Sequence, residues 1–417
     1  MARTARTNRG TRLLRATHRS QVTDLLRTHG PLARADMAER LGLTRSAVTA
    51  IVAELIGDGV LRELGPPAAG GPVPGRLARG RPRVLVGCDP AAARVVAAQV
   101  GARWARVMLA DAAGDVLGRE VADVTGASPG EVVERVADLA DRLTAAHDGP
   151  PVATVGICVP GAVDTTTGTV LRSEVLGWED VPLAELLGTR LGIPVFAQDV
   201  TQAATLAEAR HGRAAGARDA VVLDYGARIG VGLLLDGRLH RGTSGLAGSI
   251  GHTPVFGDTT PCRCGRVGCL EAVASVRAMV PPHVDRRHGP EDEVAAFAGA
   301  VERMRAGDTA VEATMHRALD RGAHVVATLV ALLDPDVVVL TGLIVGYADL
   351  TAHLLTRIEA LVPLENRRHL AVHTSTLGLE AWVRGAILVA LQQLQPDIRG
   401  ALSGAAAAQP EEKQHVS

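Results

Sequence analysis

Aromatic residues, lysine and cysteine are all scarce in this chain of 417 residues. Only 2% of the residues are aromatic, so a hydrophobic core must be built largely from Ala, Val and Leu. Every basic residue except Lys413 is an arginine, which we interpret as a compositional bias of the genome. No uninterrupted apolar run reaches the length of about 18 residues that a transmembrane helix needs. The N-terminus leads into no apolar segment either, which argues against a secretory signal.

The five cysteines, in a chain without a secretory signal, favour a reducing cytoplasmic location. In that compartment clustered cysteines more often bind a metal than form disulfides. The 47% apolar and 21% charged residues are ordinary for a soluble globular protein, and the length allows two or three domains.

Charge is unevenly distributed along the chain. Residues 1–83 carry 15 arginines against 6 acidic residues, a formal charge of +9, and the net charge of −1 leaves −10 for the rest. A basic segment on an acidic body favours an N-terminal module that binds a polyanion. A solvated basic arm is the alternative, which charge alone does not exclude.

The basic segment contains the pattern of a helix-turn-helix followed by a wing. Its first two helices are predicted in "SQVTDLLRTHG", which starts at Ser20, and in "RADMAERLG", where Gly42 forms the turn. Thr44 caps a third helix, "RSAVTAIVAELIGDG", whose apolar residues form one stripe. The strand "GVLRELG" leads into residues 66–83, which we interpret as a wing tip and interdomain linker because they are rich in Pro, Gly and Arg. We predict a winged helix-turn-helix domain over residues 12–75.

A helix-turn-helix places the N-terminal residues of its second helix in the major groove of DNA. The residues there that can contact bases or phosphates are Thr44, Arg45, Ser46 and Thr49. The basic residues of the wing that can follow phosphates or enter the minor groove are Arg76, Arg79, Arg81 and Arg83. We therefore predict double-stranded operator DNA as a partner. The alternative is a three-helix domain that binds a protein or has no ligand.

From residue 84 to residue 399, buried strands alternate with helices, which predicts an α/β domain. Buried strands are expected in "VVAAQV", "RVMLAD", "ATVGICVP", "PVFAQD", "AVVLDYG", "VGLLLDG" and "VVVLTG". Helices are expected over residues 129–147, 183–191, 201–212, 308–332, 348–362 and 379–395. Residues 400–417, rich in alanine and then charged, are predicted to be a disordered tail.

Three of the five cysteines are crowded into the stretch "PCRCGRVGC", with a histidine ten residues upstream of the first. Three thiolates and one imidazole form the tetrahedral shell of a structural zinc site, which leaves no open position for a catalytic water. Gly265 and Gly268 allow the short loop to fold back so that the three sulfurs face one point. The predicted zinc ligands are His252, Cys262, Cys264 and Cys269. A group of redox thiols is the alternative, although C-x-C differs from the C-x-x-C of redox sites.

The stretch "GLAGSIGHTPV" followed by "CRCGRVGCLEAVAS" resembles the signature of the ROK family of repressors, open reading frames and sugar kinases. The N-terminal motif, "GRP", "VPGAVD", "LGWEDVPL", "RIGVGLLLDGRLHRG" and "LLDPDVVVLTG" occur in the family's order. The resemblance implies a two-lobed, actin-like (ribonuclease H-like) ATPase-type fold behind the winged helix-turn-helix. It also implies a homodimer or homotetramer and the same four zinc ligands.

Sugar-binding members of the family use an Asn-Asp pair, a Glu-Ile-Gly-His stretch and a glutamate after the third cysteine. The resemblance places these positions at Gln198 and Asp199, at Ser249 and His252, and at Glu271. His252, Glu271 and Asp199 are kept, whereas glutamine replaces the asparagine and serine replaces the first glutamate. We expect these five residues to line an effector site for a sugar or sugar derivative.

The three nucleotide loops depart from the pattern of the family's kinases. Gln99 replaces the carboxylate of the first loop, and an amide is a poor Mg²⁺ ligand. Arg103 replaces its threonine, Arg228 replaces a glycine of the second loop, and Leu343 replaces a glycine of the third. Asp199 stands at the family's catalytic base, but we expect it to be inactive because all three loops that would hold the nucleotide are altered. The two arginines could instead bind a phosphorylated ligand or be surface charges.

These observations predict a cytoplasmic, ROK-type DNA-binding regulator, a repressor rather than an enzyme, controlled by a sugar-like effector and holding a structural zinc. Two alternatives are an active ATP-dependent sugar kinase with a DNA-binding domain and a regulator controlled by a protein partner.

Overall fold

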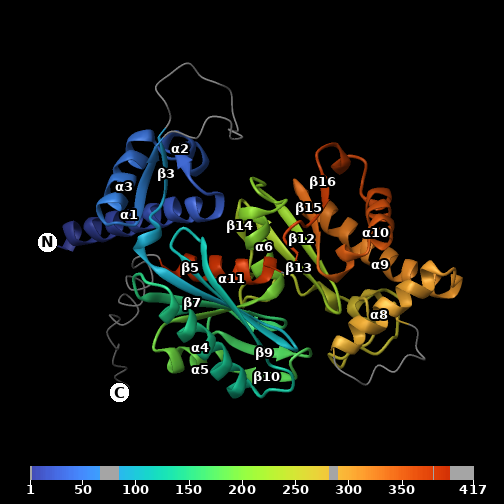
Figure 1. Ribbon diagram of the computed structural model, residues 1–417. Coiled ribbons are helices and arrows are strands. Elements are labelled where there is room, and N and C mark those ends of the chain that lie inside the picture. The colour runs from blue at the N-terminus through green and yellow to red at the C-terminus, as the bar shows by residue number, and fades with distance from the viewer. Residues whose placement is uncertain (1, 66–83, 281–289, 379, 395–417) are drawn as a thin grey trace, which may run out of the picture. The chain divides into compact units, whose positions relative to one another are not determined.

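The computed structural model describes residues 2–65, 84–280, 290–378 and 380–394. The chain divides into two compact units, a first unit with the residues up to Ala92 and a second unit of Ala93–Ala390 (Figure 1). The predicted tail over residues 400–417 lies outside the described residues. No helix in the described part of the chain is long and apolar enough to cross a membrane.

In its described residues up to Ala92, the first unit contains three α-helices and a three-stranded antiparallel sheet (Figure 1, blue). Its elements are α1 (Ala2–His29), β1 (Leu32–Ala33), α2 (Arg34–Leu41), α3 (Arg45–Gly57), β2 (Leu61–Gly65) and β3 (Leu85–Cys88). The turn glycine Gly42 has φ +63, a left-handed conformation that closes α2. The Oγ1 of Thr44 accepts a hydrogen bond from the Ala47 N–H, so Thr44 caps α3 as the sequence predicts.

Two features of the first unit differ from the expectation. Helix α1 does not begin at Ser20 but spans Ala2–His29, and Ser20 is a buried mid-helix residue whose carbonyl accepts from Thr23 Oγ1. No proline interrupts the residues before Ser20, so nothing stops the helix from extending towards the N-terminus. Strand β3 pairs with β1 and β2. The segment 66–83, itself outside the described residues, therefore joins two strands of one sheet, and the second unit starts at Ala93 rather than at residue 84.

The second unit repeats one sheet topology twice. The first sheet has the order β11-β7-β4-β5-β6 and the second has the order β14-β13-β12-β15-β16. In both sheets three antiparallel strands come first in the chain, and two further strands are added parallel to the first of them. This duplication is the two-lobed, actin-like α/β arrangement that the sequence predicts.

The first lobe comprises residues 93–199. Its strands are β4 (Arg94–Val100), β5 (Trp104–Asp111), β6 (Val116–Asp123), β7 (Val152–Val159) and β11 (Val195–Asp199). A small sheet is formed by β8 (Ala162–Asp164), β9 (Thr169–Ser173) and β10 (Trp178–Val181). Helices α4 (Pro129–Ala146) and α5 (Leu183–Leu191) bury their apolar faces against Val96, Val107 and Val155 of the large sheet. Because side chains alternate along a strand, the opposite face remains for other helices.

The second lobe comprises residues 220–378. Its strands are β12 (Ala220–Tyr225), β13 (Ile229–Leu235), β14 (Arg238–Leu239), β15 (Val337–Thr341) and β16 (Ala371–Thr374). Its helices are α7 (Leu270–Ala274), α8 (Pro290–Arg305), α9 (Thr309–Leu333) and α10 (Ala348–Leu361). One core joins α7, α8, α9 and α10 to the sheet around the buried Tyr225. The buried strands and the helices expected from the sequence are confirmed, whereas α7, α8, β6, β14, β16 and the small sheet were not predicted.

Two helices connect the lobes. Helix α6 (Val200–His211) follows β11 of the first lobe but packs against β12 and β13 of the second. Helix α11 (Glu380–Gln393) follows the second lobe and packs on the first, where Gly156 of β7 lies against its backbone. The two helices also approach closely, because a Cβ at Gly385 would lie 1.9 Å from the Ala203 carbonyl oxygen. Asp199, at the junction of β11 and α6, therefore lies where the lobes meet.

Candidate metal centre and interlobe site

The four predicted zinc ligands come together in the second lobe. His252 lies on a short 3₁₀ turn (Ile250–His252), and the cysteines precede or begin α7. One donor atom from each of His252, Cys262, Cys264 and Cys269 lies within 4.8 Å of all the others. The Cys262 Sγ is 3.8 Å from His252 Nδ1, and the Cys264 and Cys269 Sγ atoms are 3.6 Å apart. Tetrahedral bonds of about 2.1–2.3 Å to zinc would set donor atoms about 3.4–3.8 Å apart, so the donor set fits such an ion.

The electrostatics of the thiols also fit a cation. Burial, together with the thiols of Cys264 and Cys262, raises the pKa of Cys269 to about 12. Burial acts against ionisation of Cys264 as well, but hydrogen bonds from Arg266 bring the pKa of that thiol down to about 7. The Cys264 thiolate therefore forms readily, and its negative charge opposes ionisation of the Cys269 thiol. A divalent cation would relieve this conflict, because metal ligation stabilises all three thiolates together.

The loop of residues 252–269, which we call the metal loop, is attached to both lobes. From the second lobe, Arg321 of α9 contacts Asp258 of the loop with an Nη2–Oδ2 distance of 2.9 Å. Arg263 of the loop pairs with the buried Glu293 of α8. From the first lobe, Arg172 of β9 donates from Nη2 to the Arg263 carbonyl oxygen at 3.2 Å. The metal loop is therefore a physical link between the lobes.

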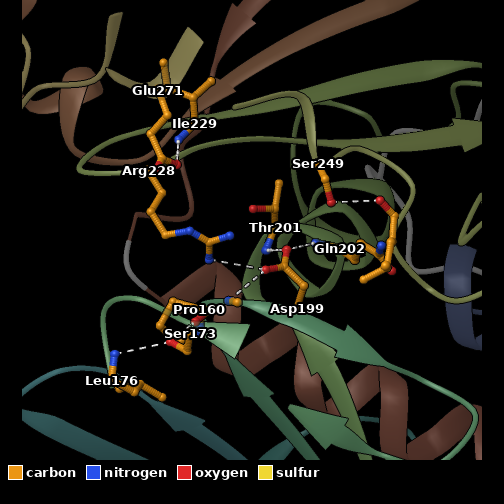
Figure 2. Close-up of polar contacts among 12 residues, drawn as sticks. Pro160, Ser173, Leu176, Asp199, Thr201, Gln202, Arg228, Ile229, Ser249 and Glu271 are labelled. Carbon is orange, nitrogen blue, oxygen red and sulfur yellow. Dashed lines mark hydrogen bonds and ion pairs between the residues drawn. The ribbon is translucent and has the colours of Figure 1, made fainter. Parts of the chain in front are cut away.

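Both carboxylate oxygens of Asp199 are occupied (Figure 2). Its Oδ1 caps α6 by accepting from the N–H groups of Thr201 at 2.8 Å and Gln202 at 3.4 Å. Its Oδ2 accepts from the Gly161 N–H at 3.4 Å and lies 3.7 Å from Nη1 of Arg228. A general base needs a free oxygen towards the hydroxyl it deprotonates. In this structure the cationic Arg228 stands beside that carboxylate.

Arg228 extends from the turn between β12 and β13 towards Asp199 (Figure 2). It interacts electrostatically with two further carboxylates, Asp224 at the end of β12 and Glu271 on α7. Burial raises the pKa of Asp224 to about 6, the charge of Asp199 adds to this, and Arg228 opposes it. Burial also raises the pKa of Glu271, whose Oε2 accepts from the Ile229 N–H at 3.4 Å.

The five predicted effector residues do not all face one point. Asp199 and Glu271 lie on either side of Arg228, and His252 belongs to the metal centre. Gln198 is buried, and its amide group contacts Gln202 and accepts from Arg241 Nε at 3.4 Å. Ser249 is exposed and donates to the Leu246 carbonyl at 2.8 Å (Figure 2). Ligand contacts by Gln198 and Ser249 stay predictions.

The altered residues of the first and third nucleotide loops are engaged with the protein itself. Gln99 is buried and its Oε1 accepts from Arg106 Nη1 at 2.9 Å. Arg103 is exposed, lies 3.6 Å from Asp123 and stands over the Trp104 ring at 4.8 Å. Leu343 begins a 3₁₀ turn (Leu343–Gly346) beside Gly226 of the second loop. Of the two substituted arginines, only Arg228 reaches the interlobe site.

Sequence reasoning missed Asp224 and Gly161 as members of this site. Asp224 had a usable signal, since it stands near the carboxyl end of the strand "VVLDY", directly before the second nucleotide loop. Gly161 lies in the motif "VPGAVD", but its part in the site is a backbone N–H, which no side-chain pattern indicates.

The predicted DNA-contacting residues of the first unit are exposed at the start of α3. They are Thr44, Arg45, Ser46 and Thr49. The predicted wing arginines Arg76, Arg79, Arg81 and Arg83 lie outside the described residues. Helix α1 is tied to α3 on the other side by ion pairs from Arg15 and Arg19 to Glu54, so α3 is supported from behind while its N-terminus is open.

Comparison with known proteins places the second unit in a family. A family model described as the ROK family matches residues 95–393. The chain belongs to the ROK family. A protein of Caldicellulosiruptor sp. (strain Rt8B.4), provisionally named a xylose repressor, is 26% identical over 400 residues, 92% of this chain and 97% of that protein. The DNA-binding transcriptional repressor Mlc of Escherichia coli K12 is 30% identical over 273 residues, 64% of this chain and 65% of Mlc.

A solved ROK family transcriptional regulator, described as a homologue of E. coli Mlc, has the same fold. It superimposes with a TM-score of 0.69 at 23% sequence identity, and the aligned residues cover 91% of this chain and 96% of the solved chain. The ROK fold is therefore found here together with the N-terminal helical unit.

Proposed function

We propose that this ROK protein is a DNA-binding transcriptional repressor that responds to a sugar and is not a sugar kinase. The observation that carries the proposal is a three-helix unit with an exposed, capped α3 in the same chain as a two-lobed ROK body. Relatives named as xylose repressor and as the repressor Mlc support this reading. The described elements of the first unit match the helix-turn-helix arrangement that reads operator half-sites.

Recognition of DNA would rest on the N-terminus of α3. Arg45 can donate two hydrogen bonds to a guanine, and Ser46 and Thr49 can contact bases or phosphates. The side chain of Thr49 already donates to the Arg45 carbonyl at 2.8 Å, which fixes its rotamer at the helix surface. The positive charge of the first 83 residues would supply the part of the affinity that falls with salt.

The absence of kinase activity is proposed from the occupied Asp199. In a sugar kinase this carboxylate would accept a proton from the attacking hydroxyl, and glycine loops would hold the phosphates. Here Arg228 fills one loop and pairs with the base, and Gln99 is an amide bonded to Arg106. We expect no sugar-dependent ATP turnover, which a coupled assay for ADP release with a sugar panel would measure.

The metal centre would hold a structural zinc. His252, Cys262, Cys264 and Cys269 would bind it, and the ion supplies charge neutralisation and cross-linking of the loop when bound. Contacts with Arg321, Glu293 and Arg172 keep the metal loop attached to both lobes. Glu271, two residues after Cys269, is thereby held beside Arg228.

Effector control would work through the lobes. A sugar that binds where the lobes meet would favour one lobe arrangement, and in a homodimer or homotetramer this would change the spacing of the winged units relative to two half-sites. DNA affinity would then fall as the effector binds. A protein partner acting on the same body is the alternative source of the signal.

Fluorescence anisotropy tests the proposal. Full-length protein is titrated onto labelled DNA from its own upstream region at fixed salt, with D-xylose, D-glucose and their phosphates. Arg45→Ala should weaken binding by about 5- to 150-fold, since a bidentate contact contributes about 1–3 kcal/mol. Arg142→Ala, which removes the same charge from α4, serves as the control. Binding that no sugar changes would point to a protein partner, and equal affinity of the two variants would contradict the assignment of α3.

A further inference from the structure

Asp199 is shared by both lobes through a single oxygen atom. Its Oδ2 accepts from the N–H of Gly161, which belongs to the first lobe, and faces Nη1 of Arg228, which belongs to the second. Asp199 itself stands between β11 of the first lobe and α6, which packs on the second. Separation of Arg228 from Asp199 would therefore remove an ion pair between the lobes.

Arg228 is surrounded by more negative charge than it carries. Its side chain is 28% exposed and that of Asp199 is 17% exposed, so their interaction is only partly screened by water. Asp224 and Glu271 also act on Arg228, and Glu174 acts on Glu271. A phosphate or carboxylate entering here would meet these carboxylates and an arginine that is already paired. An uncharged ligand would meet no such repulsion.

Arg228 can leave Asp199 without becoming an unpaired cation. Asp224 and Glu271 remain as neighbours of opposite charge. The Arg228 Nε is buried and has no hydrogen-bond partner among the described residues, so movement of the guanidinium breaks no hydrogen bond from this nitrogen. A ligand hydroxyl can replace it on Asp199, because a carboxylate accepts strong hydrogen bonds from hydroxyl groups.

We propose that Arg228 is an internal competitor for Asp199 that selects an uncharged, polyhydroxylated effector, whose hydroxyl displaces Arg228 from Oδ2. The inference rests on the proposed function in that a sugar is the effector, and it adds the class of sugar and the residue that selects it. Arg228 then has two effects: it lowers the affinity for the neutral sugar, and it makes sugar binding release a contact between the lobes.

Calorimetric titration of the full-length protein with D-xylose, D-glucose and D-glucose 6-phosphate tests the selection. Arg228→Ala should bind the neutral sugar about 5- to 30-fold more tightly than the unaltered protein, the range expected for a partly buried ion pair. Glucose 6-phosphate should bind neither protein. Arg103→Ala, which removes the arginine of the first loop that pairs with Asp123, should leave sugar affinity unchanged. Weaker binding of the neutral sugar by Arg228→Ala, or tight binding of the phosphate that this variant loses, would overturn the inference.

Amide hydrogen exchange without ligand separates this inference from the proposed function. In Arg228→Ala the N–H groups around Asp199 and Ile229, on the two sides of the ion pair, should exchange at least about fivefold faster, because an ion pair that joins the lobes is lost. Faster exchange with no sugar bound by either protein would retain the competing pair and refute the sugar as effector. Unchanged exchange together with unchanged sugar affinity would remove Arg228 from any role in selection.

Discussion

Gly251→Ala is the substitution whose effect the structure specifies most closely. Gly251 lies in the turn that carries His252, with β13 on one side and α7 on the other. A Cβ at this position would stand 2.5 Å from the Ile229 carbonyl oxygen and 3.1 Å from Oε2 of Glu271. Cβ atoms essentially never come within 3.0 Å of another atom, so the turn must move by about 0.5 Å or more against backbone.

Overpacking of this kind costs about 1–3 kcal/mol in the free energy of unfolding. For a unit of this size we expect the melting temperature to fall by about 2–10 °C. The moved turn carries His252 away from the cysteines, so metal content per chain should fall as well. Thermal unfolding by circular dichroism and metal analysis by mass spectrometry measure the two effects.

Gly299→Ala provides the control, because nothing lies within 4 Å of a Cβ at that position in α8. It should be neutral or slightly stabilising, since alanine is the better helix former. If Gly251→Ala melted at the same temperature as Gly299→Ala and kept its metal, the close approach of this turn to Ile229 and Glu271 would be refuted.

Three further predictions address the metal centre, the carboxylate of Asp224 and the N-terminus of helix α3. Cys264→Ser should lose most of the bound metal and weaken sugar-dependent release from DNA. The control Cys158→Ser, which alters a buried cysteine of the first lobe, should keep its metal content. Equal metal content in the two variants would show that the cysteine cluster does not bind the metal. Asp224→Asn should stabilise the protein by about 1–3 kcal/mol above pH 6. The pKa of Asp224 is raised to about 6 in the native state, so its ionised form destabilises that state above pH 6, and the neutral asparagine removes this cost. This advantage should shrink as the pH falls from 6 towards 4, as chemical denaturation across that range would show; a difference independent of pH would contradict it. Thr44→Ala should cost about 1 kcal/mol of stability and lower operator affinity, measured by denaturation and anisotropy, and an unchanged midpoint would mean that the cap contributes nothing.

The local elements of this protein could be predicted because their signals lie within a few residues of one another. The stripe of α3 and its Thr44 cap follow from helical spacing and from one hydroxyl that meets a nearby N–H. The approach of the three thiols was equally predictable, because Cys262, Cys264 and Cys269 are close in sequence and a turn is enough to bring them together. The α/β class of the duplicated sheets was predicted, but the small sheet and β6 were not. The alternating exposure of β6 departs from the pattern of a buried strand.

Contacts between distant segments were decided by the tertiary structure alone. Residues 84–88 look like the start of the α/β body, yet β3 completes the sheet of the first unit because its partners are β1 and β2. Strand pairing depends on which edges meet in space, and no local pattern encodes that choice.

By itself, the sequence predicted helix α3 and its cap, the four side chains that come close enough to hold a metal, and the substitutions in the three nucleotide loops. It also showed that Arg228 stands in place of a glycine, but left open whether this arginine binds a ligand or is a surface charge. The fold brings the β12–β13 turn to Asp199 at the junction of β11 and α6, so Arg228 is a partly buried partner of that carboxylate rather than a surface charge. The physical reason is that charge acts through space over a few ångströms, and residues 199 and 228 become neighbours only once both lobes have formed.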